Sequence, residues 1–203
     1  MNQEQNTEER IIAAAKEIFI QRGFAGARMQ NIADKAGINK AMLHYYFRSK
    51  EKLFEVIFDE AFGTLMPRVQ AILSSDKSVM GKLEDFIDQY LQLIAENPHV
   101  PIFIVHELSQ APDRFVDRIK SKGHFPNVAM ILSQLQTEVA AGTLRPYNPV
   151  HLIMNVISMC AFPFVAKPML KAVTDMDEAT WDMLMKNRNE EVKNFVKQAL
   201  LMC

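Results

Sequence analysis

The stretch that decides the fold is residues 29–47, which read MQNIADKAGINKAMLHYYF. Its first half places apolar residues at helical spacing and then reaches Gly37, a residue type that commonly ends a helix. Its second half predicts a short helix over about 40–46, with Leu43 and Phe47 as apolar anchors. Two helices joined by a short turn that contains glycine form a helix-turn-helix, in which the second helix enters the major groove of DNA.

Helical periodicity continues on both sides of this motif. Upstream, Thr7 is the predicted N-cap of a first helix that Gly23 ends, and downstream a long helix is predicted over about 50–73. The chain has only seven glycines and no convincing alternation of apolar and polar residues, which argues against a β-sheet. We therefore predict an all-α fold of about nine helices. The later helices are expected at about 78–96, 98–110, 112–141, 149–170 and 177–202, with an interruption at Gly123 and Pro126.

Charge is distributed unevenly along the chain. The whole sequence has a formal net charge of −1, whereas residues 20–50 contain six basic residues and one acidic residue. This segment therefore carries +5 and the remainder −6. A basic N-terminal module on an acidic body indicates a polyanionic partner at one end, although a solvated helix pair would give the same composition.

The composition is that of an ordinary soluble globular protein, with 49% hydrophobic and 23% charged residues. Cys160 and Cys203 are too few for a disulfide framework or a thiolate metal site. The polar first ten residues lack the features of a secretory signal, and the most apolar run, 152–166, is too short and too interrupted to span a membrane. We expect a reduced, cytoplasmic protein with no membrane partner.

Motifs for enzymatic chemistry are weak in this sequence. Residues 106–110 read HELSQ, a near match to the zinc-binding HExxH motif in which Gln110 replaces the second histidine. His106 and Glu107 are therefore expected to line a pocket or to form a satisfied core pair. The sequence shows no Gly-x-Ser-x-Gly, P-loop or dinucleotide-binding glycine pattern, so we predict no catalytic residues, no metal site and no cofactor.

The outer face of the predicted short helix suits contact with nucleic acid. Lys40, His44, Tyr45 and Tyr46 lie away from its apolar anchors and combine basic and aromatic side chains. Lys50 stands at the start of the following helix, where free N–H groups also attract phosphate. Tyr45 has an alternative role, which is packing against the first helix.

The stretch from residue 23 to residue 57 resembles the DNA-binding signature of the TetR/AcrR family of bacterial transcriptional regulators. The rest of the chain is similar to that family in length, in helical layout and in a turn with Gly142, Leu144 and Arg145. The matching positions are Gly23, Phe24, Ile32, Ala33, Ala36, Gly37, Ile38, Lys40, Leu43, Phe47, Ser49, Lys50 and Glu51.

This resemblance implies a three-helix helix-turn-helix domain followed by a larger helical domain that binds a small molecule and forms the dimer. We place the DNA-binding domain at residues 7–66, with the motif at about 29–48, and the effector-binding and dimerisation domain at 67–203. The implied function is sequence-specific binding of double-stranded operator DNA by a homodimeric repressor, which a small hydrophobic or aromatic ligand releases. The alternatives are a helical dimeric interaction protein and a small all-α enzyme, neither of which binds DNA.

The resemblance also assigns roles to residues of the motif. By position, His44, Tyr46 and Lys50 are expected to contact phosphates. Departures from the family pattern, such as Met42 in place of the usual threonine, concern which operator sequence is read. The residues expected nearest to base edges are Gln30, Asn39, Lys40, Met42 and Tyr45, and Arg28 belongs to the same predicted surface.

The predicted effector site lies among the middle helices, where helix bundles enclose mostly apolar clefts. Its candidates are Phe86, Tyr90, Phe103, His106, Met130, Gln134 and Phe162, with plain core packing as the alternative for each apolar one. Residues 149–166 and 177–202 are expected to form a four-helix bundle with their partner copies, as the family's last two helices do. The interface candidates are Trp181, Leu184, Met185, Val192 and Phe195, although this apolar face could equally pack inside one subunit.

Overall fold

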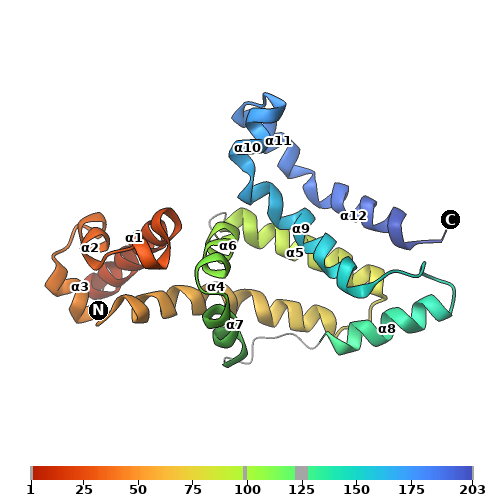
Figure 1. Ribbon diagram of the computed structural model, residues 1–203, viewed down its shortest axis with the longest axis horizontal. Coiled ribbons are helices and arrows are strands. Elements are labelled where there is room, and N and C mark those ends of the chain that lie inside the picture. The colour runs from red at the N-terminus through yellow and green to blue at the C-terminus, as the bar shows by residue number, and fades with distance from the viewer. Residues whose placement is uncertain (1, 98–99, 122–127, 203) are drawn as a thin grey trace. The chain divides into compact units, whose positions relative to one another are not determined.

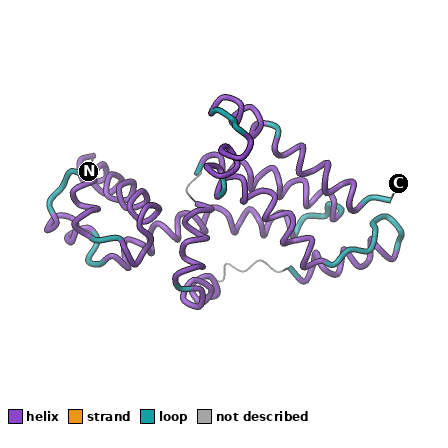
Figure 2. The backbone as a smooth tube through the Cα atoms, turned by 45° about the horizontal axis from the view of Figure 1, so that its top comes forward, coloured by secondary structure: helices purple, strands orange, loops and turns teal. Residues whose placement is uncertain are grey.

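Helices make up almost all of the regular structure of this chain (Figures 1 and 2). The computed structural model describes residues 2–97, 100–121 and 128–202, and within these ranges it contains twelve α-helices and no β-strand. One isolated antiparallel bridge joins Leu144 to Leu201. The predicted all-α fold is confirmed.

The predicted helices are present, and several of them are divided. In chain order they are α1 (Asn2–Gly26), α2 (Met29–Ala36), α3 (Lys40–Tyr46), α4 (Lys50–Leu73), α5 (Val79–Glu96), α6 (Val100–Gln110), α7 (Pro112–Ser121), α8 (Ala129–Ala140), α9 (Pro149–Val165), α10 (Lys167–Thr174), α11 (Glu178–Lys186) and α12 (Arg188–Leu200). α9 and α10 separate at Ala166, because Pro168 in the first turn of α10 has no N–H with which to continue the preceding helix. α11 and α12 separate at Asn187, where the backbone departs from helical geometry (φ −99°, ψ 5°). The interruption predicted at Gly123 and Pro126 lies outside the described residues.

The first helix begins earlier than predicted, at Asn2 rather than after Thr7. Its regular part ends at Gly23, as predicted, because Gly23 has φ 65° and ψ 176°, a non-helical conformation that strains any residue with a side chain. A short helical turn follows this kink, so that α1 extends to Gly26. The N–H of Ala27 donates to the Gly23 carbonyl over 3.1 Å, so helical hydrogen bonding resumes after the kink.

Two compact units divide the chain. The first contains residues up to Thr64 together with the stretch from Ile102 through α7, and the second contains Leu65 to Pro101 together with α8 to α12. Most of α6 and all of α7 thus pack with the N-terminal unit, whereas the sequence prediction assigned everything from residue 67 onward to one domain. The assignment of DNA-binding and effector-binding roles to these parts stays a prediction.

The core of the first unit is shared by α1, α2, α3 and the first half of α4. Aromatic rings explain why α7 belongs here, because Phe115 packs edge-on against Phe58 and Phe62, with ring centroids 5.5 and 5.7 Å apart. Phe58 and Phe62 also stack on each other at 4.4 Å. Fully or almost fully buried apolar side chains of this unit are Ile11, Ala15, Phe19, Ile32, Ala33, Leu43, Leu53, Phe54 and Phe58.

The core of the second unit lies among α5, α9 and α12, with α8 packed against α5. Ion pairs tie α12 to α5: Lys193 pairs with Asp88 at 2.6 Å, and Lys197 pairs with Glu84 at 2.5 Å. The buried side chains that fill the centre include Val79, Ile87, Ile94, Val156, Cys160, Val192, Val196 and Leu200.

α9 is strongly apolar, and one of its faces is buried in the core of the second unit. Within the described ranges no single helix is long and apolar enough to cross a membrane, and α9 and α10 meet that test only as a pair bent by 77°. Cys160, on α9, is fully buried, and burial raises the pKa of its thiol to about 12. A thiol with so high a pKa is unreactive near neutral pH, as expected for core packing.

Candidate DNA-binding and ligand-binding sites

The turn between α2 and α3 has the geometry of a helix-turn-helix. Gly37 has φ 66° and ψ 38°, the left-handed conformation that glycine adopts without a steric penalty. The N–H of Ile38 donates to the Ala33 carbonyl (3.0 Å), and the Arg10 guanidinium donates to the Ala36 carbonyl (2.6 Å). These bonds satisfy the last carbonyls of α2 and fix the direction in which the chain continues to α3.

α3 is held by its inner face and presents its outer face to solvent. Leu43 is fully buried, as predicted. The Asn39 side chain caps the helix by accepting a hydrogen bond from the Met42 N–H (2.7 Å). Tyr45 is 78% exposed and touches only the ring edge of Tyr46 among the described aromatic side chains, with centroids 5.5 Å apart. Its side chain is thus available for an outside contact, and the alternative of packing against α1 is wrong.

The remaining predicted DNA contacts differ in how free their side chains are. Gln30 donates to Asp34 (2.7 Å), and His44 Nδ1 lies 3.2 Å from the Arg48 carbonyl oxygen. Both residues must give up or share a local bond in order to reach DNA, and the same holds for the capping residue Asn39. The exposed members of the set are Arg28, Gln30, Asn39, Lys40, Met42, His44 and Tyr45, whereas Tyr46 and Lys50 are half-buried.

Lys50 is engaged inside the first unit. Its ammonium donates to the carbonyl oxygens of Phe24 (2.7 Å) and Ala27 (3.1 Å), and it lies 4.4 Å from the centroid of the Phe24 ring. The side chain therefore joins the start of α4 to the end of α1. This role was missed in the sequence, because the two segments are more than twenty residues apart and only the fold brings them together.

The contacts of Lys50 predict a loss of stability on its removal. Lys50→Met keeps the apolar stem but leaves two carbonyls without their charged donor, so we expect a loss of about 1.5–3 kcal/mol. Calorimetric melting should show a Tm lower by roughly 3–12 °C. The control is Lys52→Met, which removes an exposed lysine from the same helix. If the Tm is unchanged and the slope of log affinity for DNA against log salt concentration falls by about one, Lys50 acts only as a phosphate contact.

His106 packs against the kink in α1. A Cβ atom at Gly23 would stand 1.4 Å from His106 Nε2, so the imidazole occupies the space that the glycine leaves open. Beside it, the guanidinium of Arg114 lies 4.4 Å from the centroid of the Phe24 ring. The expectation that His106 lines an effector pocket with Phe86 and its companions is therefore not supported, because its side chain is committed to the first unit.

Glu107 is a buried carboxylate next to this contact. It is 5% exposed, and its Oε1 has no hydrogen-bond partner among the described residues. Burial raises the pKa of Glu107, and His106, the backbone N–H of Phe24 and Arg114 oppose that rise. The charged form is therefore less favourable in the fold than in the unfolded chain, where the carboxyl has its ordinary pKa near 4.5.

This raised pKa predicts a pH-dependent gain from Glu107→Gln. A carboxyl whose pKa is higher in the fold than in the unfolded chain decreases the free energy of unfolding as the pH rises from the unfolded pKa to the folded pKa. Above the folded pKa the decrease is complete and stays constant. The amide avoids this loss, so at pH 7 the variant should be more stable by about 1 kcal/mol. Melting curves should show the difference between variant and parent shrinking as the pH falls from the raised folded pKa toward 4.5, and vanishing below about pH 4.5. A difference that is independent of pH would show that the buried charge is not its cause.

The second unit contains two hollows that meet at one side chain. An apolar cavity of about 130 Å³ lies between α4, α5, α8 and α9 and is lined by residues that include Leu73, Leu83, Phe86 and Val156. A groove of about 500 Å³ with a polar lining lies between the turn that follows α4 and the side of α8, and its lining includes Ser74, Asp76, Met130, Ser133 and Gln134. Lys82 lines both hollows. We refer to them as the apolar cavity and the polar groove.

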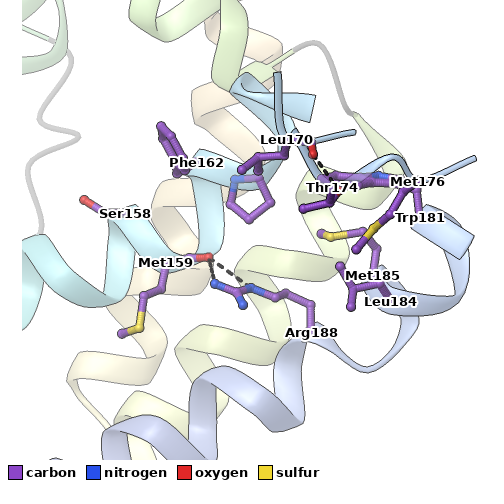
Figure 3. A pocket seen from close by; sticks show the side chains of 11 residues that line it. Ser158, Met159, Phe162, Leu170, Thr174, Met176, Trp181, Leu184, Met185 and Arg188 are labelled. Carbon is purple, nitrogen blue, oxygen red and sulfur yellow. Dashed lines mark hydrogen bonds between the residues drawn. The ribbon is translucent and has the colours of Figure 1, made fainter. Parts of the chain in front are cut away.

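A third hollow lies between the C-terminal half of α9 and the helices α10 and α11 (Figure 3). This C-terminal groove has a volume of about 460 Å³ and is almost wholly apolar. Arg188 closes one side, because its guanidinium donates to the carbonyl of Met159 at 2.9 Å (Figure 3). Its lining residues are Ser158, Met159, Phe162, Pro163, Leu170, Thr174, Met176, Trp181, Leu184, Met185 and Arg188.

The predicted effector residues are divided among these places. Phe86 lines the apolar cavity, Met130 and Gln134 line the polar groove, and Phe162 lines the C-terminal groove. Tyr90 is buried in the core, where its ring stacks on Phe86 at 5.2 Å. The side chain of Phe103 lies outside the described residues. The candidates of the second unit therefore do not converge on one site, because residue type alone cannot assign helices to a common hollow.

The predicted interface residues are also divided. Trp181 and Val192 are buried within the subunit, at 5% and 1% exposure, and Met185 is half-buried. Leu184 and Phe195 are 49% and 60% exposed. Trp181 and Val192 therefore pack inside one subunit, which is the alternative role of this apolar face. Leu184 and Phe195 are exposed and can contact a partner subunit.

Comparison with known proteins agrees with this geometry. Residues 11–57 match the family model of bacterial regulatory proteins of the tetR family. Over 184 residues the chain is 27% identical to the HTH-type transcriptional regulator RutR of Escherichia coli O157:H7, covering 87% of this chain and 84% of RutR. It is 28% identical over 153 residues to the HTH-type transcriptional repressor KstR2 of Mycolicibacterium smegmatis, covering 73% of each. The solved hemolysin II transcriptional regulator HlyIIR shares the fold, with a TM-score of 0.63 at 24% identity over 92% of this chain and 97% of that one.

An anchored helix-turn-helix with an exposed second helix, followed by a larger helical unit, defines a DNA-binding regulator. Residues 11–57 carry the DNA-binding domain of the tetR family of bacterial regulatory proteins, and the relatives that match most of the chain are transcriptional regulators. Regulators of this family bind operator DNA and act as dimers that respond to small-molecule effectors. The relatives are regulators and not enzymes, which agrees with the weak catalytic motifs of the sequence.

Proposed function

We propose that this protein is a homodimeric repressor that leaves its operator when a small ligand with an apolar body binds to the second unit. The observation that carries the DNA-binding part is the outer face of α3. Lys40, Met42 and Tyr45 are exposed there, while the buried Leu43 fixes the orientation of the helix. Large apolar side chains that are exposed together mark an interaction surface.

The chemistry of these side chains fits the major groove. A lysine can donate to the acceptors of guanine, and an apolar side chain such as Met42 can touch the methyl group of thymine. The Tyr45 hydroxyl can both donate and accept a hydrogen bond at a base edge or a phosphate. Arg28, the N-cap residue of α2, and His44, in the last turn of α3, are exposed and add positive or hydrogen-bonding groups for the DNA backbone. Because operator DNA in bacteria is cytoplasmic, the same proposal places the protein in the cytoplasm.

The proposed dimer uses the exposed apolar side chains of α9 and α12. Met154 and Phe162 on α9 are 55% and 51% exposed, comparable to Phe195 on α12. Single exposed apolar residues are ordinary, whereas several on two adjacent helices favour an interface. Buried Trp181 and Val192 support this surface from inside the subunit instead of contacting the partner.

Selection of bound fragments from the genome of the host organism tests the proposed function. A dimer with two-fold symmetry should enrich fragments that contain an inverted repeat, with half-sites about one helical turn, roughly 34 Å, or a multiple of it apart. Footprinting should then show two protected half-sites on one face of the DNA. Enrichment without any repeated sequence, or binding that disappears entirely at physiological salt, would reject a sequence-specific repressor.

A further inference from the structure

Lys82 is a charged side chain at a position where the fold places apolar ones. It is 3% exposed, and Lys82 and Glu107 are the two charged side chains buried in the described part of the chain. On α5 it follows Val79 by three residues and precedes Phe86 by four, so it lies on the apolar face of the helix. Lysine is almost never fully buried unless it is paired.

The ammonium of Lys82 has neutral partners only. It donates to the carbonyl oxygen of Leu73 and to Oε1 of Gln134, both at 2.8 Å. No carboxylate of the described residues lies within ion-pair distance of it. Glu138 is one step removed, since it accepts a hydrogen bond from Nε2 of Gln134. An ammonium has three protons to donate, so one remains for a further acceptor.

Lys82 stands where the two hollows of the second unit meet. Leu73, which accepts one of its hydrogen bonds, lines the apolar cavity, and Gln134, which accepts the other, lines the polar groove. The cavity holds about 130 Å³, close to the volume of about 150 Å³ that binds a benzene ring in an apolar protein interior. The groove beside it is large enough for polar substituents or ordered water.

We infer that the effector is a small amphipathic carboxylic acid, whose apolar body fills the cavity and whose carboxylate binds Lys82. The inference rests on the proposed function, because it names the ligand class of a regulator whose effector is unknown. A carboxylate supplies the counter-charge that the described residues do not, and its hydrogen bond to a buried ammonium is stronger than one between neutral groups. A neutral ligand of the same shape would fill the cavity and leave the charge unpaired.

Calorimetric titration of the full-length protein with phenylacetate and with phenylacetamide tests this inference. The two probes share a six-membered ring and differ in charge. We expect phenylacetate to bind at least about tenfold more tightly, a difference of about 1.4 kcal/mol. In Lys82→Met the acid should lose this advantage and bind no better than the amide. Lys186→Met, which removes an exposed lysine of the second unit that lines neither hollow, should keep it.

A second variant covers the case in which Lys82→Met does not fold. Ile131 lines the apolar cavity, and Ile131→Phe fills part of it while Lys82 is kept, so binding of both probes should weaken. Equal affinity for acid and amide in the parent protein, or no binding of either at millimolar concentration, overturns the inference. So does full retention of acid binding in both variants.

The same preparations separate this inference from the proposed function. Fluorescence anisotropy with the selected operator fragment reports DNA binding independently of the titration. If operator binding is intact and the acid shows no preference, the ligand class is wrong and the repressor stands. If the acid binds through Lys82 and no operator is found, the binding site stands and the repressor is wrong.

Discussion

Replacing Tyr45 by alanine is expected to lower operator affinity by about 30-fold to 10⁴-fold while leaving the fold intact. The side chain is 78% exposed on α3, so its removal costs the subunit little packing. A good contact with a base edge contributes about 1–3 kcal/mol, and a homodimer makes each contact twice, which gives about 2–6 kcal/mol. The measurement is fluorescence anisotropy with the selected operator fragment, supported by melting curves of the free protein.

The salt dependence of binding shows whether Tyr45 acts through bases or through charge. Tyrosine is neutral, so the slope of affinity against salt concentration should not change in the variant. The control is Val105→Ala, which truncates an exposed apolar residue on α6 outside the motif and should bind the operator normally. If Tyr45→Ala binds the operator as tightly as the control does, the outer face of α3 is not the surface that contacts DNA.

The helix-turn-helix could be predicted because its signals are local. Apolar spacing places Ile32 and Leu43 inward, and Gly37 supplies the left-handed turn, all within one short stretch of chain. Helix bounds elsewhere were less predictable where two weak signals competed. Thr7 resembles an N-cap, yet α1 begins at Asn2, since the neighbouring residues also favour a helix.

The sites could not be predicted to the same degree, because they depend on which helices become neighbours. The contact of His106 with Gly23 joins segments more than eighty residues apart, and no spacing rule connects them. The division of the effector candidates among three hollows has the same cause. Lys82 did leave a signal in the sequence, since it stands at helical spacing between Val79 and Phe86 on an otherwise apolar face.

Replacing Phe195 by aspartate is expected to dissociate the dimer. Phe195 is 60% exposed, while Val192, Val196 and Leu200 hold the opposite face of α12 in the core, so the subunit itself should stay folded. Truncating a central aromatic contact costs about 2–4 kcal/mol, and a two-fold interface contains the residue twice. A buried, unpaired carboxylate adds to this loss. The dimer dissociation constant should rise by about 10³-fold or more, which sedimentation velocity measures directly.

Loss of the dimer should abolish specific operator binding although the helix-turn-helix is unchanged, because one subunit reaches only one half-site. Val173→Asp is the matched control, since it places the same charge on a residue that is 79% exposed on α10. Joining two Phe195→Asp chains by a flexible linker raises the effective concentration of the second subunit to about the millimolar range and should restore operator binding. Restoration separates a lost dimer from a damaged DNA-binding surface. A Phe195→Asp protein that remains dimeric and binds its operator normally would place the interface on another face of the second unit.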